Sequence, residues 1–237
     1  MQLFYNKDLT SKDSQFTFDK TESRHIVKVL RKKNGDILQI TNGKNELFTV
    51  KILLANDKKC LVEIIRSEVI QKPWNYKLHV AIAPTKSNDR LEWFLEKATE
   101  IGIDEITPII CANSERTVLK KDRLEKIVQS AMKQSLKFVV PKLNESVKFS
   151  DFMKQDFEGD LFIAHCEEQD KKSFSKEIKP TRNITILIGP EGDFNPNEIK
   201  NAIAQKFIPV TLGKSRLRTE TAGLLAIQTV ALINEIN

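Results

Sequence analysis

Residues 186–199, ILIGPEGDFNPNEI, carry the clearest fold signal in the chain. An apolar run ends at Gly189, a tight loop follows, and Asn195 begins a helix as its N-cap, with Glu198 completing a capping box. Strand, loop and helix in this order indicate a parallel α/β sheet, in which ligands bind at the carboxyl ends of the strands. Glycines in such a loop let the backbone approach a ligand closely. Taken alone, the pattern also fits a generic strand–helix turn.

A second loop of the same kind lies in residues 210–227, VTLGKSRLRTETAGLLAI. The predicted strand ends at Gly213, and Thr219 begins an apolar helix. Arg216 and Arg218 lie in the loop between them. Arginines beside an apolar helix are better placed to meet an anion or the polar edge of a base than to form a merely solvated surface.

Alternating strands and helices extend this pattern over the rear part of the chain. Strands are expected at 78–83, 105–110, 160–166, 183–189 and 208–213, and helices at 90–102, 122–138, 195–205 and 219–236. In the front part, a short helix that begins at Thr21 or Ser23 precedes short strands on both sides of the hairpin signal Asn42-Gly43. We therefore expect a small β-barrel or open sheet in residues 1–72 and a parallel-sheet α/β domain in residues 74–237.

The last predicted helix, 219–236, is apolar around most of its circumference. Such a helix must be buried on more than one side. Packing within its own domain and packing against a second copy of the chain, as a homodimer, both satisfy that requirement.

Composition and charge exclude several classes of protein. The 237 residues are 40% hydrophobic and 30% charged, as in ordinary globular proteins, and no apolar run approaches the length of a membrane span. Three scattered cysteines and no secretory leader favour a cytoplasmic location. Of the formal net charge of +6, the first 72 residues carry +5, with 14 Lys+Arg against 9 Asp+Glu. A basic front part favours a polyanionic partner such as RNA, although it also fits a solubilising surface.

Several common catalytic motifs are absent from the sequence. It contains no GxGxxG, no P-loop, no GxSxG and no metal-ligand spacing among its three histidines, so we expect no metal. An enzyme that binds a phosphorylated nucleotide at GPEGD is one alternative, but the missing P-loop lysine weighs against it.

Five stretches in a fixed order are more specific than any one motif. They are HIVKVLRKKNGD (25–36), EKATEIGIDEITPI (96–109), SERT (114–117), IGPEGDF (188–194) and LGKSRLRTETA (212–222). Together they resemble the RsmE family of SPOUT-class RNA methyltransferases, whose members methylate N3 of a uridine in small-subunit (16S) ribosomal RNA with S-adenosyl-L-methionine. Asp193 departs from the family, which often has glycine at that position.

The resemblance implies a fold, a cofactor and partners. The front domain would be PUA-like, the rear domain SPOUT-like with a C-terminal trefoil knot, and two chains would form a homodimer that acts on small-subunit ribosomal RNA or the 30S particle. The residues that match the two cofactor loops of the family are Ile188, Gly189, Glu191, Gly192, Leu212, Gly213, Leu217 and Thr219. A non-catalytic RNA-binding ribosome-assembly factor that retains the fold is the alternative, although such a factor needs no cofactor pocket.

The chemistry of methyl transfer suggests the catalytic residues, and positive charge suggests the RNA-binding ones. Uridine N3 must lose a proton to become a good nucleophile, and Arg218 could stabilise the developing anion, while its own pKa is too high for a base. Glu191 is the candidate for removing the proton or orienting Arg218, and a structural role, in which it accepts backbone N–H bonds in the loop, is at least equally open. The basic residues expected to hold RNA phosphates are Arg24, His25, Lys28, Arg31 and Lys32, with Arg216 in the second loop. A solvated helix face is the alternative for the cluster around the first helix.

Overall fold

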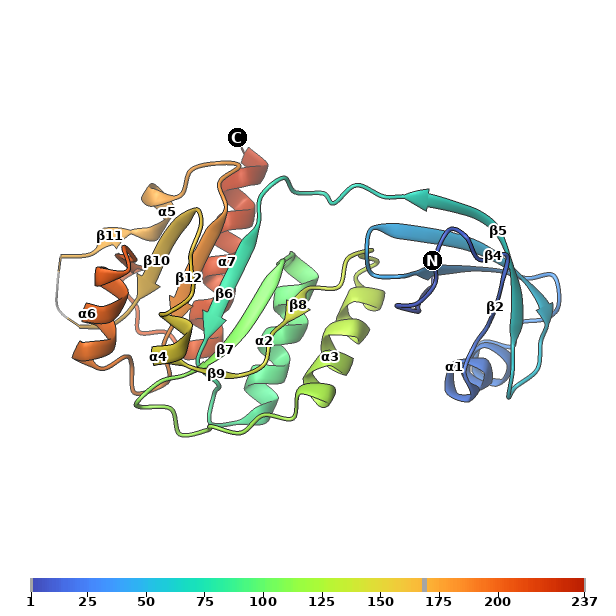
Figure 1. Ribbon diagram of the computed structural model, residues 1–237, viewed down its shortest axis with the longest axis horizontal. Helices are drawn as coiled ribbons and strands as arrows, with labels where there is room; N and C mark the ends of the chain where they lie inside the picture. Colours follow the sequence, from blue (N-terminus) through green and yellow to red (C-terminus); the bar gives the residue numbers. More distant parts are fainter. Residues whose placement is uncertain (1, 168–169, 237) are drawn as a thin grey trace. The chain divides into compact units, whose positions relative to one another are not determined.

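The computed structural model describes residues 2–167 and 170–236, and the chain separates into two compact units (Figure 1). The front unit comprises residues 1–73 with 132–140, and the rear unit 74–131 with 141–237. The elements of the front unit are β1 (Leu3–Tyr5), β2 (Gln15–Thr17), α1 (Lys20–Arg24), the π-helical segment η1 (His25–Val29), β3 (Ile37–Thr41), β4 (Glu46–Leu54) and β5 (Leu61–Val69).

The rear unit alternates strands and helices. Its elements are β6 (Leu78–Ile82), α2 (Asn88–Ile101), β7 (Glu105–Ile110), α3 (Lys121–Gln134, shared with the front unit), β8 (Lys142–Leu143), β9 (Val147–Lys148), α4 (Phe149–Phe152), β10 (Asp160–Ala164), β11 (Lys172–Ser173), α5 (Phe174–Glu177), β12 (Ile184–Ile188), α6 (Pro196–Ala204), β13 (Ile208–Thr211) and α7 (Thr219–Ile236).

The front unit is built on a five-stranded sheet in the order β1-β3-β4-β5-β2. The β3–β4 hairpin around Asn42-Gly43 is confirmed, with Thr41 paired to Leu47. The short helix begins earlier than expected, because Asp19 rather than Thr21 or Ser23 is its N-cap and accepts the Glu22 N–H at 2.8 Å. Apolar side chains from the sheet and from the first helical segment form one core, which includes Phe4, Phe18, Ile26, Ile40 and Phe48.

Residues 132–140, which the sequence analysis assigned to the rear domain, pack against the front unit. Val140 N–H donates to Gly43 O at 3.0 Å, and Asn45 N–H donates to Phe138 O at 2.9 Å. A Cβ on Gly43 would lie 2.6 Å from Val140 Cγ2, so this close approach needs glycine. Helix α3 was expected to reach position 138 but ends at Gln134, because the chain here leaves the helix to make these contacts.

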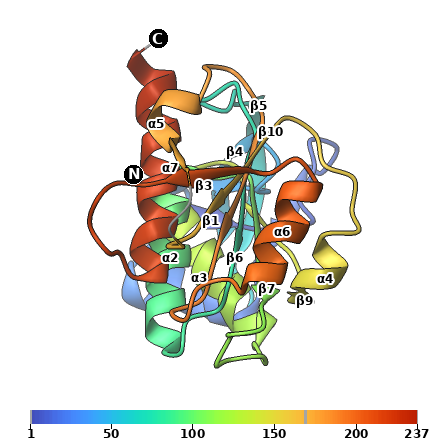
Figure 2. The same ribbon diagram turned by 90° about the vertical axis from the view of Figure 1, so that its left-hand side faces the viewer.

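The rear unit is a parallel sheet in the order β11-β13-β10-β12-β6-β7-β8, with β9 also paired to β7. This confirms the expected α/β class. Figure 2 shows α2, α5 and α7 on one face of the sheet and α4 and α6 on the other. The alternation along β6 explains the two layers: Ala81 faces the cluster that holds Phe152 and Ile199, while Ile82 lies near Phe94 and α7. The trefoil knot stays a prediction.

Helix α7 buries one side against the sheet and α2. Gly223 lies at the closest approach, where a Cβ would stand 2.6 Å from the Phe94 ring. The opposite side of the helix leaves Leu225 and Leu232 exposed. Packing within the unit therefore accounts for one side of this apolar helix and not for the other.

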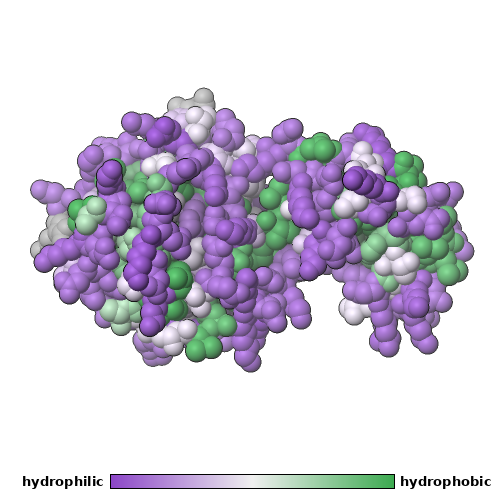
Figure 3. Space-filling model, viewed as in Figure 1, coloured by the Kyte–Doolittle hydropathy of each residue, from purple (hydrophilic) through white to green (hydrophobic). Residues whose placement is uncertain are grey.

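On the face shown in Figure 3, apolar side chains occur in small groups among polar ones. The large apolar side chains exposed in the described part of the rear unit are Trp93, Val118, Ile203, Leu225, Leu232 and Ile236.

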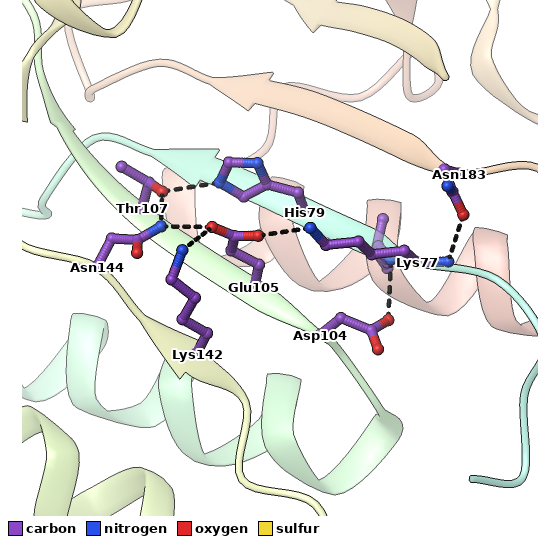
Figure 4. A network of polar contacts seen from close by, with 9 residues as sticks. Lys77, His79, Asp104, Glu105, Thr107, Lys142, Asn144 and Asn183 are labelled. Atoms are coloured by element: carbon purple, nitrogen blue, oxygen red, sulfur yellow. Dashed lines mark hydrogen bonds and ion pairs between the residues drawn. The ribbon is translucent and has the colours of Figure 1, made fainter. Parts of the chain in front are cut away.

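A polar network ties together the amino ends of β6, β7 and β8 (Figure 4). His79 Nε2 lies 2.7 Å from Thr107 Oγ1, and Asn144 donates to both Thr107 and Glu105. Lys142 and Lys77 form ion pairs with Glu105 at 2.9 and 3.0 Å. Burial, partly offset by Glu105 and reinforced by the two lysines, lowers the pKa of His79 to about 4.

This network predicts loss of stability in mild acid. The pKa of His79 in the folded protein lies below the ordinary value of 6.5, so on acidification the unfolded chain takes up the proton first. The contribution of neutral His79 to the free energy of unfolding is therefore complete above about pH 6.5 and is lost progressively as the pH falls to about 4. Between pH 7.5 and 4.5 we expect the protonation of His79 in the unfolded chain to lower the free energy of unfolding by about 2–3 kcal/mol. Urea unfolding at both pH values measures this. In the His79→Gln variant the side chain at position 79 does not titrate, so the free energy of unfolding should fall less between the two pH values. An equal fall in both proteins would contradict the prediction.

Candidate functional site

A cavity of about 740 Å³ opens at the carboxyl ends of the rear sheet, where ligands bind in parallel α/β folds. It lies among the segments that follow β10, β12 and β13, together with the first turn of α7. The structure brings every residue expected from the two loops into its lining: Ile188, Gly189, Glu191, Gly192, Leu212, Gly213, Arg216, Leu217, Arg218 and Thr219. The roles of these residues stay predictions.

The first loop is held against α7. Thr219 Oγ1 donates to Gly189 O at 3.0 Å, so the two stretches that the sequence analysis singled out are hydrogen-bonded to each other. Gly189 leaves little space for a side chain, because a Cβ there would lie 3.0 Å from the Phe194 ring. A Cβ on Gly192 would lie 3.1 Å from Asn113 Cβ. Both glycines thus form a backbone cradle at the cavity wall.

Asp193 closes the turn of this loop. Its N–H donates to Pro190 O at 2.9 Å, and its φ of 62° is a left-handed conformation that glycine and, less readily, Asp or Asn adopt. This explains how an aspartate stands where the RsmE family often has glycine. The carboxylate also accepts the Cys166 N–H at 2.7 Å, which joins the loop to the end of β10.

Glu191 is oriented by backbone. Its Oε1 accepts the Lys86 N–H at 2.9 Å, and the guanidinium of Arg116 donates to Lys86 O at 2.6 and 3.1 Å. The Lys86 peptide therefore connects the SERT stretch to the first loop. Glu191 thus accepts a backbone N–H, but from Lys86 and not from its own loop, and its role stays a prediction.

The second loop supplies positive charge. Arg216 and Arg218 are exposed and line the cavity, and Gly213 has a φ of 139°, which a residue with a side chain rarely adopts. Arg218 O accepts the Ala222 N–H at 2.8 Å, so the last residue of the loop begins the hydrogen bonding of α7. Such a site suits a ligand or transition state that carries negative charge.

Among the lining residues that the sequence analysis did not expect are three basic side chains from outside the two loops. Arg90 comes from α2, and Lys171 and His165 come from the segment after β10. The end of the predicted strand 160–166 would have indicated His165, whereas Arg90 comes from a helix with no motif. Burial first, and the Lys171 charge second, lower the pKa of His165, so its ring is neutral near pH 7. Among the described residues, neither ring nitrogen of this buried histidine has a hydrogen-bond partner.

The predicted RNA-binding cluster lies in the front unit, on α1, η1 and the turn after them. Arg24, Lys28 and Arg31 are exposed, while His25 and Lys32 are half-buried. Lys28 pairs with Asp57 at 3.7 Å. The cluster thus belongs to a different unit from Arg216.

No metal-binding group was found among residues 2–167 and 170–236, and within the same ranges no helix is long and apolar enough to cross a membrane.

Comparison with known proteins places this site in a family. The family described as RNA methyltransferase domain matches residues 72–231, and the family described as RNA methyltransferase PUA domain matches residues 18–65. Ribosomal RNA small subunit methyltransferase E of Buchnera aphidicola subsp. Acyrthosiphon pisum (strain APS) is 32% identical over 222 residues, which cover 90% of this chain and 87% of the relative. The chain belongs to the RsmE family of RNA methyltransferases.

Solved structures of RsmE-like proteins share the whole fold. A probable rRNA-methyltransferase from Porphyromonas gingivalis is 40% identical, with a TM-score of 0.93 over 100% of this chain and 99% of that one. Ribosomal RNA small subunit methyltransferase E from Neisseria gonorrhoeae, solved bound to S-adenosyl methionine, is 28% identical, with a TM-score of 0.82 over 98% of both chains. The five-stranded front sheet is accordingly the PUA-like domain, and the parallel sheet is the methyltransferase domain, as the sequence resemblance implied.

Proposed function

We propose that this RsmE-family protein transfers a methyl group from S-adenosyl-L-methionine to N3 of a uridine in small-subunit ribosomal RNA. The observation that carries the proposal is the single cavity that gathers both family loops and Arg218. The relative from Neisseria gonorrhoeae, similar over 98% of this chain, was solved with that cofactor. Because ribosomal RNA is its substrate, the proposal places the protein in the cytoplasm.

The cavity fits the cofactor on two counts. Its volume of about 740 Å³ is in the range of small-molecule sites, and two of its lining residues are glycines, whose backbone a ligand can approach closely. The residues proposed to hold the cofactor are Ile188, Gly189, Glu191, Gly192, Leu212, Gly213, Leu217 and Thr219. When bound, S-adenosyl-L-methionine supplies an electrophilic methyl group on a sulfonium.

The protein's own residues prepare the nucleophile. Uridine N3 must give up its proton before its electron pair can form the new bond to carbon, and the base then carries negative charge. Arg218, exposed at the cavity wall, is proposed to stabilise that charge through its fixed guanidinium donors. Glu191 is the carboxylate proposed to accept the proton or to orient Arg218, with Oε1 held by the Lys86 N–H.

The test is a pair of measurements on the full chain. Calorimetric titration with S-adenosyl-L-methionine should show saturable binding, and labelled methyl groups should appear at uridine N3 of unmethylated small-subunit particles. Binding without transfer to any particle would favour the non-catalytic assembly factor. Transfer to another position of the RNA would keep the family chemistry and replace the proposed acceptor atom.

We propose that the basic cluster of the front domain holds RNA phosphates. Arg31 is exposed, and with Lys32 it continues the line of positive charge that begins at Arg24 and Lys28. Neutralising Arg31 and Lys32 together should weaken RNA binding for all sequences and reduce the slope of log affinity against log salt by about 2, one for each phosphate that the variant no longer neutralises. Filter binding between 50 and 200 mM salt, about the range over which such ion pairs respond, measures the slope. An unchanged slope would move the RNA site elsewhere.

A homodimer is proposed as the working form. The support is the exposed apolar side of α7, where Leu225 and Leu232 have no cover within their own unit. A second copy of the chain would bury this side of the helix.

A further inference from the structure

A groove of about 600 Å³ adjoins the cavity where α2 begins. Arg90, Arg216, Leu217 and Arg218 line both the groove and the cavity, so the two spaces share a wall. A nucleotide in the groove would be a near neighbour of the base that reaches the cavity.

Trp93 is the aromatic residue of this groove. It lies in the second turn of α2, and 45% of its surface is exposed, which is unusual for the largest apolar side chain. An exposed indole face is a stacking surface for a nucleic-acid base, and every base presents a π-face to it.

The charges around Trp93 favour a nucleic acid. Arg90, Arg216 and Arg218 line the groove, against Asp89 and Glu220. Glu220 is buried, with 6% of its side chain exposed, and lies 3.8 Å from Arg90 Nε. The accessible charge is therefore mainly positive.

We propose that Trp93 stacks on an unpaired base next to the target uridine, while Arg90 and Arg216 contact the phosphates of that strand. The inference rests on the proposed function and adds a substrate subsite to it. Stacking tolerates any base, so this subsite holds the single strand without reading its sequence, and the cavity receives the nucleotide beside it.

The chain contains a direct reporter for this stacking. It has two tryptophans, and the other, Trp74, is half-buried and donates its Nε1–H to Asp104 at 3.1 Å. In the Trp74→Phe variant, emission comes from Trp93 alone. Titration with a short oligouridylate, in the presence of S-adenosylhomocysteine, should quench this emission saturably. The emission change of wild type minus that of Trp93→Phe gives the Trp93 signal while Trp74 is retained.

Variants at position 93 then measure the stacking. Trp93→Ala should weaken oligouridylate binding roughly 5- to 100-fold, the range for loss of one stacked base, and Trp93→Phe should restore most of it. Cofactor affinity, measured by calorimetry, should stay unchanged in both. Val118→Ala, another exposed apolar residue of the rear unit, is the matched control and should bind the oligonucleotide like wild type.

Two outcomes would overturn the inference. Unquenched Trp93 emission with unchanged affinity in Trp93→Ala would place the RNA elsewhere. A change of oligomeric mass in Trp93→Ala without a change in RNA affinity would make the groove an interface between copies. Failure of the proposed function has a different signature: quenching by the oligonucleotide persists, while the wild type neither binds the cofactor nor transfers a methyl group.

Discussion

Replacing Arg218 by alanine should lower the rate of methyl transfer by about 10²–10³-fold, the usual effect of removing one donor to a developing anion. The arginine is exposed at the cavity wall and has no place in the apolar core, so the folded structure should survive the change. Its backbone carbonyl, which accepts the Ala222 N–H, is retained in any substitution. Single-turnover methylation of small-subunit particles measures the rate directly.

Two readouts separate this role from a binding role. Cofactor affinity of Arg218→Ala should remain near that of wild type in calorimetry, because the proposed partner of Arg218 is the uridine anion. Arg218→Lys keeps the charge but loses the planar set of donors, so it should recover only part of the rate. A fully active alanine variant would refute the proposed role, and an equal loss of cofactor affinity would make Arg218 a binding residue instead.

The parts of the site that the sequence predicted are those in which local chemistry and the parallel sheet agree. An apolar run before Gly189 and a capping box after it, both confirmed, place one loop at the carboxyl edge. The same argument applies to the loop before Thr219. Parallel strands end at the same edge, so the two loops lie together there, and the hydrogen bond from Thr219 to Gly189 joins them.

The parts that were missed depend on tertiary packing. Arg90 reaches the cavity because α2 packs beside α7, and nothing in its local pattern marks it. Residues 132–140 have an ordinary helical and apolar pattern, and only their tertiary contacts, such as the approach of Gly43 to Val140, show that they belong with the front unit. The left-handed backbone conformation of Asp193 was also not predicted, because aspartate gives a weaker turn signal than glycine.

The second large effect is expected at Gly192, which lines the cavity beside Asn113. A Cβ there would lie 3.1 Å from Asn113 Cβ, closer than ordinary van der Waals separation. Asn113 cannot easily retreat, because its side-chain amide donates to the carbonyls of Gly192 and Asp193 at 3.0 Å each. A leucine at position 192 must therefore displace Asn113 or shift the loop that lines the cavity. Either result should weaken cofactor binding by about 10- to 100-fold, which is the affinity change that corresponds to the usual free-energy cost of overpacking.

A graded series distinguishes obstruction of the cavity from loss of the fold. Gly192→Ala adds only the Cβ, so it should cost much less affinity than Gly192→Leu in calorimetric titration. Lys200→Leu, on the exposed side of the helix that follows the loop, adds the same side chain away from the cavity and should bind normally. Because Gly192 itself is exposed, the melting temperature of Gly192→Leu should fall little. Unchanged affinity in that variant would mean that the cofactor lies elsewhere and that this glycine serves only the turn.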